Sequence, residues 1–559
     1  MKNNKQVKKI LSFLWVPVLL LLITIPIVLP YAHKGYFPTH DGEWAVVRLG
    51  DMFREIRDHQ FPPRYSGNLN FGFGYPLFEF AYPLPYYAGL IVHFLKFSFV
   101  DSIKLLFAGT VVVSTIFMYL ASKEFWGRRS AGFVSALLFA YLPYRLVDLY
   151  ARGSIGESFA FVFFAFLFYC WIKLYHNPKS LWYVGMMSLG ISGLILSHNI
   201  MATLFLPVFV VFVGATMWKD YKKYLIQFIS ACFLGLAGAS FFWLPALAEK
   251  NLILLSKIPI ADRSINYVTI WDLLFRPWGY GIPEAATGGF TYQIGWPHLI
   301  VFLGVCFFVL FSMFKKRPVG KQERTGVVLL FLAILMALML FPFTNGIWKT
   351  IPLLKEINYP WTFLGPIGFV LSFLGGYLCS VKKRWVTISA VLLGITALLL
   401  YLPYARPQKF TYNDDSYYFT NDATTTSSSE YTPLWVMEKP LSRVLEKVEI
   451  ISGKGIISNL SYSSKYTAFD IAVSTPSLVR INTIYYPGWK ITVEGKEVSA
   501  NYSNSRGVMD ISLPTGSHKV KATFGETPLR LFSDLFSLAG IGGILFLLAV
   551  SLLKKKENI

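Results

Sequence analysis

The residues best suited to acid–base chemistry lie in the stretch THDGEW at 39–44, directly after the first apolar stretch of the chain. His40, Asp41 and Glu43 would lie at a membrane surface, where partial dehydration tunes a carboxylate toward proton abstraction or metal binding. The spacing also fits a structural interpretation, in which Asp41 is the N-cap of the amphipathic helix EWAVVRLGDMFREIRD. Residue types and spacing alone leave a general base and a helix cap as alternatives.

A second polar group lies in YARGSIGES at 150–158. Arg152 and Glu157 come at an expected helix start, and Gly153 and Gly156 permit a close backbone approach. The arginine fork can hold a phosphate through two hydrogen bonds, while Glu157 can cap the helix or pair with Arg152. An Arg–Glu ion pair at the lipid boundary explains the same residues equally well, so both interpretations stand.

Two further stretches bring polar groups to the ends of apolar runs. SHNI at 197–200 is an expected tight hairpin, in which His198 and Asn199 face the outer aqueous boundary or a cavity. Polar groups at that depth are costly and indicate phosphate contact or proton transfer, although a lone histidine is more often structural. NYPWTF at 358–363 adds Trp361, whose alternative role is in the aromatic belt of a membrane interface.

The stretch FPPRYSGNLNFGFGYPLFEFAYPLPYY at 61–87 is rich in aromatic residues, glycine and proline. Its aromatic residues are either interfacial belt residues or stacking partners for a sugar ring beside the carboxylates. FGFG lacks the strand and helix of a nucleotide-binding fingerprint. The chain has no P-loop, no HExxH and no GxSxG, so we expect neither nucleotide hydrolysis nor serine hydrolase chemistry.

The elements that must position these residues are membrane helices. The 559 residues are 54% hydrophobic and only 15% charged, and apolar runs near 20 residues recur, which excludes a soluble globular enzyme. The net charge of +21 comes from short Lys and Arg clusters between the apolar runs, so it indicates membrane topology and no nucleic acid partner. All four cysteines lie within or at the ends of apolar runs, and no disulfide framework is expected.

About twelve transmembrane helices follow when the N-terminus and every basic cluster are cytoplasmic. The expected spans are 10–30, 103–122, 129–144, 157–175, 181–197, 200–217, 222–246, 297–314, 326–343, 360–380, 385–403 and 531–553. The short apolar run 84–95 is expected to be a re-entrant or interfacial part of the first outer loop. Residues 1–403 thus form a transmembrane module with large outer loops at 31–102 and 247–296.

A β-rich domain is expected outside the membrane at 404–530, where stretches such as YTAFDIAVS alternate in polarity between Pro and Gly turns. It reads as a sandwich-like antiparallel domain, entered through a polar connector at 412–432. Within YYPGWK, Tyr486 and Trp489 either stack weakly on an acceptor or belong to the turn and core of the domain. Residues 531–559 add a final span and a basic cytoplasmic tail.

The residue pattern resembles known membrane families. A carboxylate after the first span, a long first loop and a large loop after the seventh span resemble the GT-C superfamily of membrane glycosyltransferases. HDGEW, the aromatic stretch at 61–87, SHN and NYPWTF are similar to a bacterial membrane family labelled 6-pyruvoyl-tetrahydropterin-synthase-related, and YYPGWKITVEGKEV with LPTGSHKVKATF resembles the outer domain of the YfhO family. The zinc-binding histidines of a soluble pterin synthase are not found.

The resemblance implies an inverting glycosyltransferase of the plasma membrane. It would take a sugar from a polyprenyl-phosphate donor within the lipid and pass it to a surface glycan or polymer on the outer face. Asp41 or Glu43 would be the catalytic base. The expected donor-phosphate and substrate contacts are His40, Arg64, Arg152, Glu157, His198, Asn199 and Trp361. Asp41 and Glu43 would also suit a divalent ion in the oligosaccharyltransferase branch, but without a clear third ligand we expect no metal and no cofactor.

Two other functions compete with sugar transfer. A transporter or flippase for lipid-linked glycans predicts polar residues along the middle of several spans and paired repeats, and the sequence has neither. A non-catalytic scaffold would bind cell-wall polymer through its β domain. Turnover of a polyprenyl-phosphate sugar distinguishes an enzyme from a scaffold.

Overall fold

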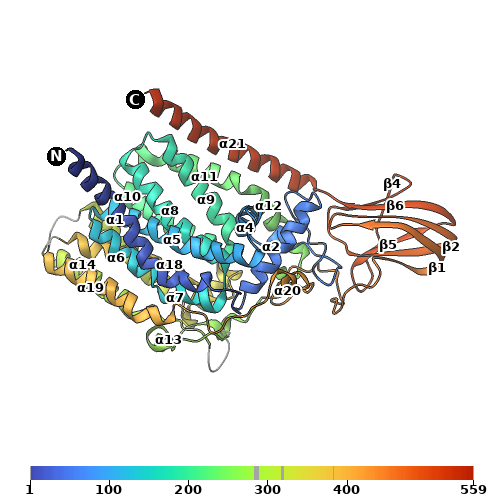
Figure 1. The fold of residues 1–559 in the computed structure, drawn as a ribbon, viewed down its shortest axis with the longest axis horizontal. Helices are drawn as coiled ribbons and strands as arrows, with labels where there is room; N and C mark the ends of the chain where they lie inside the picture. The colour runs from blue at the N-terminus through green and yellow to red at the C-terminus, as the bar shows by residue number, and fades with distance from the viewer. Residues whose placement is uncertain (1, 282–288, 316–319, 382, 558–559) are drawn as a thin grey trace.

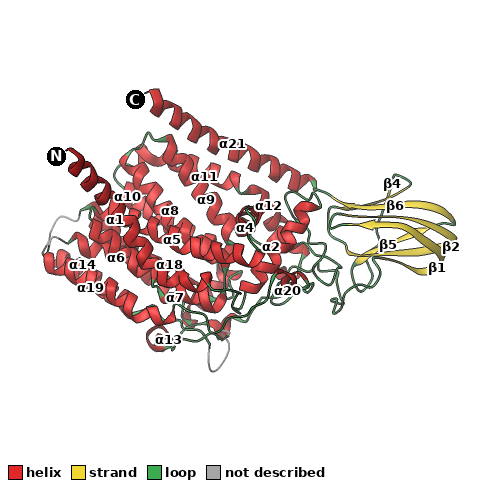
Figure 2. Cartoon of the chain, in the orientation of Figure 1, coloured by secondary structure: helices red, strands yellow, loops and turns green. Residues whose placement is uncertain are grey.

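The computed structural model describes residues 2–281, 289–315, 320–381 and 383–557. It consists of a helical body and a β domain that projects from one end of that body (Figures 1 and 2). Both termini lie at the end of the helical body far from the β domain (Figure 1). A polytopic helical protein with a C-terminal antiparallel β domain is therefore confirmed.

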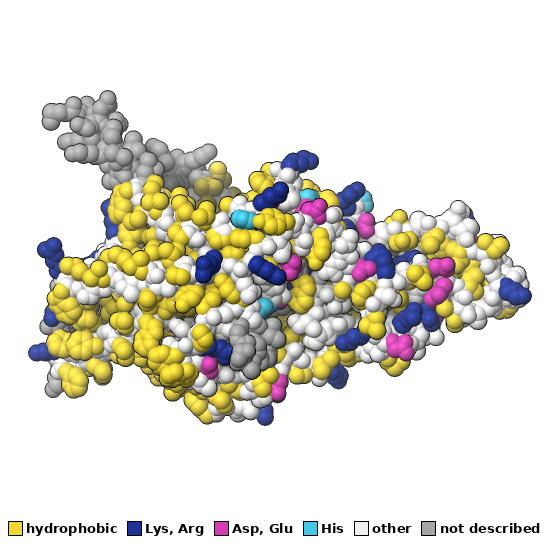
Figure 3. Space-filling model, turned by 60° about the horizontal axis from the view of Figure 1, so that its bottom comes forward, with side chains coloured by type: hydrophobic (Ala, Val, Ile, Leu, Met, Phe, Trp, Pro, Cys, Tyr) yellow, Lys and Arg dark blue, Asp and Glu magenta, His cyan; other side chains and the backbone are white. Residues whose placement is uncertain are grey.

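Eight helices in the described part of the chain are long and apolar enough to cross a membrane, or up to 11 when three bent pairs are included. The eight are α1 (Lys2–Val28), α5 (Phe99–Trp126), α8 (Ile155–His176), α10 (Asn199–Met217), α14 (Trp296–Phe314), α18 (Leu364–Ser380), α19 (Arg384–Tyr401) and α21 (Pro528–Glu557). Hydrophobic side chains cover most of the visible face of this body, whereas the β domain has a mixed charged surface (Figure 3). The chain is a multi-pass membrane protein.

The three bent pairs each combine a longer and a shorter apolar segment. They are α6 (Arg129–Ala140) with Pro143–Arg152, bent by 44°, α11 (Tyr221–Gly238) with Ser240–Leu252, bent by 69°, and α15 (Lys321–Leu338) with Pro342–Thr350, bent by 91°. A shorter apolar helix, α9, covers Leu181–Ser197. Each of the expected spans coincides with one of these helices or pairs, because length and apolar content are local properties of the chain.

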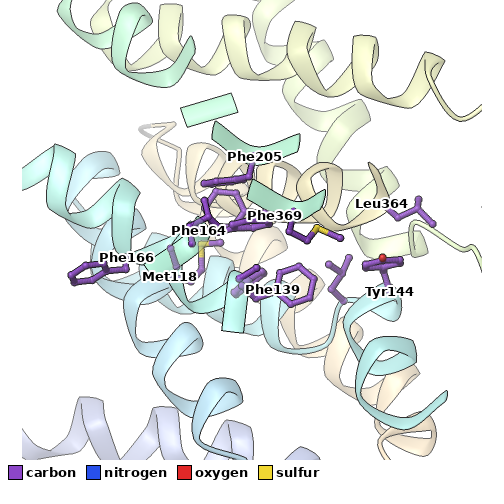
Figure 4. Close-up of a cluster of buried hydrophobic side chains, with 14 of the residues drawn as sticks. Met118, Phe139, Tyr144, Phe164, Phe166, Phe205, Leu364 and Phe369 are labelled. Carbon is purple, nitrogen blue, oxygen red and sulfur yellow. The ribbon is translucent and has the colours of Figure 1, made fainter. Parts of the chain in front are cut away.

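Aromatic packing around α18 forms the centre of the body (Figure 4). Every residue from Leu364 to Cys379 is buried. Phe164 of α8 and Phe205 of α10 stack with ring centres 3.6 Å apart, and Phe369 of α18 meets Phe205 edge-on at 5.1 Å. Stacked and edge-on aromatic pairs add to the burial of apolar area, and they fix the mutual positions of the three helices.

The first loop folds into α2 (Gly42–Arg57), the single turn α3 (Leu77–Phe80) and α4 (Leu84–Phe94). At 11 residues, α4 is about 16 Å long, which is too short to cross a hydrocarbon core of about 30 Å. Ile91 and Phe94 of this helix are 66% and 60% exposed. A short helix with an exposed apolar side suits the re-entrant or interfacial position expected for 84–95.

Short elements complete the helical body and the connector. They are α7 (Pro143–Val147), the π-helix Asp148–Arg152, α12 (Ser240–Glu249), α13 (Ile270–Phe275), α16 (Asn345–Thr350), α17 (Pro352–Lys355), α20 (Asp415–Phe419) and single 3-10 turns at Leu29–Ala32, Lys250–Leu252, Leu254–Ser256, Arg263–Asn266, Pro342–Thr344, Pro360–Phe363 and Leu402–Tyr404.

The β domain is one antiparallel sheet built on a long central strand. Its strands are β1 (Val448–Tyr462), β2 (Tyr466–Ile484), β3 (Trp489–Val493), β4 (Lys496–Val498), β5 (Val508–Leu513) and β6 (Gly516–Phe524). Strand β2 pairs with β1 along one edge, and along the other edge with β6 in its first half and β5 in its second half. Because one strand serves two partners, the sheet divides and folds around a shared core. The strands begin only at 448, so the residues between 404 and 447 are connector.

Tyr486 and Trp489 belong to that core. They are 0% and 5% exposed, and the Trp489 ring meets the Tyr65 ring of the first loop edge-on at 5.6 Å. The Tyr65 hydroxyl donates to the Ile484 carbonyl at 2.7 Å. Acceptor stacking on these two residues, expected above as one alternative, is therefore wrong, because aromatic faces packed inside a core are closed to a ligand. They join the first loop to the β domain.

Candidate functional site

A cavity of about 550 Å³ lies where the first loop, the helical body and the connector meet. It is lined by His40, Asp41, Trp44, Ala45, Arg48, Tyr82, Tyr86, Arg152, Gly153, Ser154, Ile155, His198, Ile260, Phe290, Tyr359, Trp361, Thr426, Ser427, Glu430 and Tyr431. The lining comes from segments up to about 390 positions apart, and it combines one aromatic set with both signs of charge.

Helix α2 presents one face to this cavity. Asp41, Trp44, Ala45 and Arg48 line it, and these positions follow the i, i+3, i+4, i+7 spacing of a single helical face. Asp41 occupies the N-cap position, yet its side chain makes no capping hydrogen bond. The Thr39 hydroxyl accepts the Gly42 N–H instead, at 2.9 Å. Asp41 thus begins the helix, as the cap alternative expects, but its carboxylate makes no capping hydrogen bond.

The backbone of 39–42 is held against the π-helix Asp148–Arg152. The His40 N–H donates to the Ala151 carbonyl at 3.1 Å and the Asp41 N–H to the Arg152 carbonyl at 2.8 Å. Gly153 follows with φ of 66°, and a Cβ built on it would lie 2.7 Å from the Gly42 nitrogen. Only glycine adopts this conformation at so close an approach. The two loops that carry Asp41 and Arg152 are consequently fixed to each other.

Arg152 lies in a compact ion-pair cluster at the cavity wall. Its Nη1 donates to Glu157 Oε1 at 2.6 Å and to Asp148 Oδ1 at 3.2 Å, and its guanidinium lies 4.8 Å from the centre of the Trp361 ring. The Tyr144 hydroxyl donates to the second Glu157 oxygen at 2.8 Å. One cation therefore faces two carboxyl groups, and Glu157, which is 1% exposed, lies behind Arg152 rather than on the cavity surface.

His198 approaches the same cluster from the hairpin between α9 and α10. Its Nδ1 accepts the Met201 N–H at 3.2 Å, and its Nε2 lies 4.0 Å from Glu157 Oε1. Because Nδ1 is an acceptor, the proton of the neutral ring is on Nε2 and points toward Glu157. Burial lowers the pKa of His198 to about 4, so the imidazole is neutral near pH 7.

Asp41 has the environment expected of a base. Burial raises the pKa of its carboxyl above the ordinary value, against the opposing effect of Arg152, Arg48 and His40. A carboxylate with a raised pKa is a stronger proton acceptor while it stays ionised at neutral pH.

Two aromatic walls line the cavity. Tyr82 and Tyr86 have nearly parallel rings, 6.1 Å apart with an interplanar angle of 7°, and Tyr82 also lies 5.2 Å from the His198 ring. In the second wall Trp361 packs edge-on against Phe290 at 5.1 Å. Flat aromatic surfaces suit the apolar faces of sugar rings, and they restrict the space in which a bound ring can turn.

Besides Glu157, three expected site residues lie outside the cavity lining. Glu43 lies beside Tyr418 and Lys409, where burial raises the pKa of its carboxyl and both neighbours oppose that rise. Asn199 is exposed, and its amide donates to the Phe80 carbonyl at 3.5 Å. The expectation that they contact substrate here is wrong in position, because consecutive helical and hairpin residues point in different directions.

Arg64 is the third, and it belongs to a buried joint. Its guanidinium lies 2.6 Å from Asp534 of α21, 3.5 Å from Glu79 and 3.5 Å from Glu526, and it donates to the Phe241 carbonyl at 2.6 Å. These contacts join the first loop to α12 and to the start of the last helix. The expected substrate contact of Arg64 is therefore wrong. Its charge instead forms ion pairs that link the first loop to the last helix.

The sequence expectation omits Arg48 and the connector residues Thr426, Ser427, Glu430 and Tyr431. The sequence could have predicted Arg48 as a site residue, because it lies seven positions after Asp41 and hence on the same helical face. It could not have predicted the connector residues, since no local pattern relates them to positions near 41. Within the described ranges, no cluster of three or more His, Cys, Asp and Glu side chains could hold a metal ion.

No protein-family model matches the chain. A protein of Lactococcus lactis subsp. cremoris, itself uncharacterized, is 25% identical over 349 residues, which cover 59% of this chain and 54% of that protein. The chain thus spans about half the length of the curated relative it matches.

Solved membrane enzymes are similar in fold at low identity. The Archaeoglobus fulgidus oligosaccharyltransferase in its apo form has a TM-score of 0.48 and 13% identity, over 78% of this chain and 62% of that one. The mycobacterial arabinofuranosyltransferase AftD has a TM-score of 0.43 and 15% identity, over 74% and 27%. ArnT from Cupriavidus metallidurans, bound to undecaprenyl phosphate, has a TM-score of 0.39 and 10% identity, over 70% and 64%. Because these TM-scores are low, we infer the roles of residues only from the contacts within this chain.

Proposed function

We propose that this protein is a membrane glycosyltransferase that moves a sugar from a polyprenyl-phosphate-linked donor to a hydroxyl group of an acceptor on the outer face. One observation carries the proposal. Asp41, whose carboxylate makes no capping hydrogen bond, lines a cavity that also contains cationic groups and two aromatic walls. A base, a partner for negative charge and flat surfaces for a sugar ring are the groups that such a transfer needs.

The chemistry assigns a part to each of these groups. Asp41 takes the proton of the acceptor hydroxyl while that oxygen attacks the anomeric carbon. The bond from this carbon to the phosphate oxygen breaks on the opposite side, and the lipid phosphate leaves with the electron pair. Negative charge grows on the phosphate, so a cation in the cavity stabilises the transition state. His40, Arg48, Arg152 and His198 are the basic groups that line the cavity.

The proposed placement has the cavity and the β domain outside the cell and both termini in the cytoplasm. Two features support it. Lys and Arg clusters flank the apolar runs at positions that the positive-inside rule assigns to the cytoplasm. The termini lie at the end of the helical body opposite to the β domain, as this placement requires (Figure 1). The acceptor would then be a surface glycan or polymer.

The test is turnover by the purified full-length chain. It would be incubated in detergent with a panel of polyprenyl-phosphate sugars and with a crude acceptor fraction from the cell envelope, and the release of polyprenyl phosphate would be measured. We expect release that depends on the acceptor. Binding of donor without any release, across the panel, would contradict an enzyme and favour a scaffold.

A further inference from the structure

Four basic groups line the cavity: His40, Arg48, Arg152 and His198. The His40 ring donates from Nε2 to the Tyr280 carbonyl at 3.2 Å, and the other three groups differ in the charge that surrounds them. His198 is a neutral ring under ordinary conditions, because burial lowers its pKa to about 4. Arg152 is held by the two carboxyl groups of Asp148 and Glu157, at 3.2 and 2.6 Å. A phosphate that approaches Arg152 would meet these acids as well. Attraction and repulsion then largely cancel, since all the charges lie within a few ångströms.

Arg48 is surrounded by uncharged partners. Its Nε donates to the Thr425 hydroxyl at 3.0 Å, its Nη2 to the Thr425 carbonyl, and its Nη1 to the Tyr86 hydroxyl at 3.4 Å. In the described part of the chain none of its hydrogen-bond partners is an acid. Its positive charge is consequently not balanced by any acid in direct contact.

The hydrogen bonds of Arg48 also leave donors for a ligand. A guanidinium has five N–H groups in one plane, and the three bonds named above use one each from Nε, Nη1 and Nη2. One N–H on each terminal nitrogen remains. These two donors can serve the oxygens of one phosphate group. The Tyr86 hydroxyl accepts from Arg48 and can in turn donate its own proton.

We propose that Arg48 is the anion-binding residue of this cavity, and that its ligand is a phosphate ester. The proposal deepens the function given above and rests on it. Arg152 is then a positioning residue, which holds the backbone of Asp41 through its carbonyl and the side chain of Glu157 through its guanidinium.

The position of Arg48 along α2 suits this part. It lies seven residues after Asp41, which is about 10 Å along a helix axis. In an inverting attack the acceptor oxygen and the leaving phosphate are on opposite sides of the anomeric carbon, so the base and the cation must be separated. Asp41 and Arg48 are separated in this way on one helical face. Trp44 lies between them in the sequence and also lines the cavity.

The test measures ligand binding by the full-length chain in detergent, with isothermal titration calorimetry as the readout. The probes are farnesyl phosphate, farnesol and inorganic phosphate. The variants are R48Q, R48K and, as the matched control on the same helix, R54Q. Arg54 stacks on Phe419 at 4.3 Å and donates to its carbonyl, outside the cavity. We expect R48Q to weaken farnesyl phosphate binding roughly 10- to 100-fold. R48K should be intermediate, and R54Q and all farnesol affinities should be unchanged.

Competition by inorganic phosphate shows whether the site takes a lipid phosphate or a free one. Effective competition indicates a free phosphate ester, and weak competition indicates that the lipid chain contributes. Equal affinity of R48Q and the parent for farnesyl phosphate would overturn the proposal. So would parallel loss of farnesol binding, which indicates structural damage, and so would a parent protein that binds neither phosphate probe. Absence of sugar transfer alongside Arg48-dependent binding would instead refute only the glycosyltransferase.

Discussion

Replacement of Asp41 by asparagine is the most direct perturbation of the proposed chemistry. Asparagine has the same shape as aspartate, and the hydrogen bond from the Asp41 N–H to the Arg152 carbonyl belongs to the main chain, so the local fold should survive. The amide cannot accept the acceptor's proton. Loss of a general base lowers turnover by roughly 10²- to 10⁴-fold, which is about 3–5 kcal/mol of activation free energy.

Donor binding should respond differently from turnover. The substitution removes a negative charge from a cavity that also receives the donor phosphate, so affinity for a phosphate probe should be unchanged or tighter. The assay is release of polyprenyl phosphate by D41N and by E43Q, together with binding of farnesyl phosphate by both. E43Q is expected to keep most of its activity, because Glu43 lies beside Tyr418 and Lys409 outside the cavity.

Three results would refute this reasoning. Transfer by D41N at the parent rate would remove Asp41 as the base. Loss of transfer in E43Q with retention in D41N would assign the base to Glu43 and would contradict the cavity as the reaction site. Loss of both phosphate binding and thermal stability in D41N would mean that the carboxylate stabilises the fold and does not act as the base.

Three further perturbations follow from the same contacts. G153A should lower transfer at least about tenfold, because its methyl group would push the Gly42 backbone away. The control is G127A, at a glycine with φ of 74° and no atom within 4 Å of an added Cβ. This variant should lose only about 1–2 kcal/mol of stability to backbone strain in a thermal unfolding assay. Because burial raises the pKa of Asp41 and the base works only when ionised, kcat/KM should fall as pH drops through that raised pKa, and R48Q should move this limb to higher pH by removing a charge that lowers it. R64Q should lower the stability of the full chain by about 3–5 kcal/mol in thermal unfolding, since Arg64 pairs with buried acids. It should leave farnesyl phosphate affinity unchanged, because Arg64 is not part of the cavity lining; weaker phosphate binding would return Arg64 to the site.

The sequence by itself determined the elements of this protein. The spans follow from runs of apolar residues long enough to cross a bilayer, and the strands from alternation with a period of two; both are local properties that neighbours in the chain specify. The same local logic brought Asp41, Arg152, His198 and Trp361 to the ends of spans, and all four line one cavity. Tertiary packing brings these four ends together around the cavity.

Only the tertiary structure decided which residues share the site. Asp41 and Glu43 are two positions apart, yet the turn of α2 points one into the cavity and the other toward α20. Arg64 and Arg48 are both arginines of the first loop, but their partners differ: acids from Glu79 and the last helix contact Arg64, whereas the hydrogen-bond partners of Arg48, Thr425 and Tyr86, are uncharged. Spacing along the chain contains no information about partners hundreds of residues away, and those partners determine whether a charged group is available to a ligand.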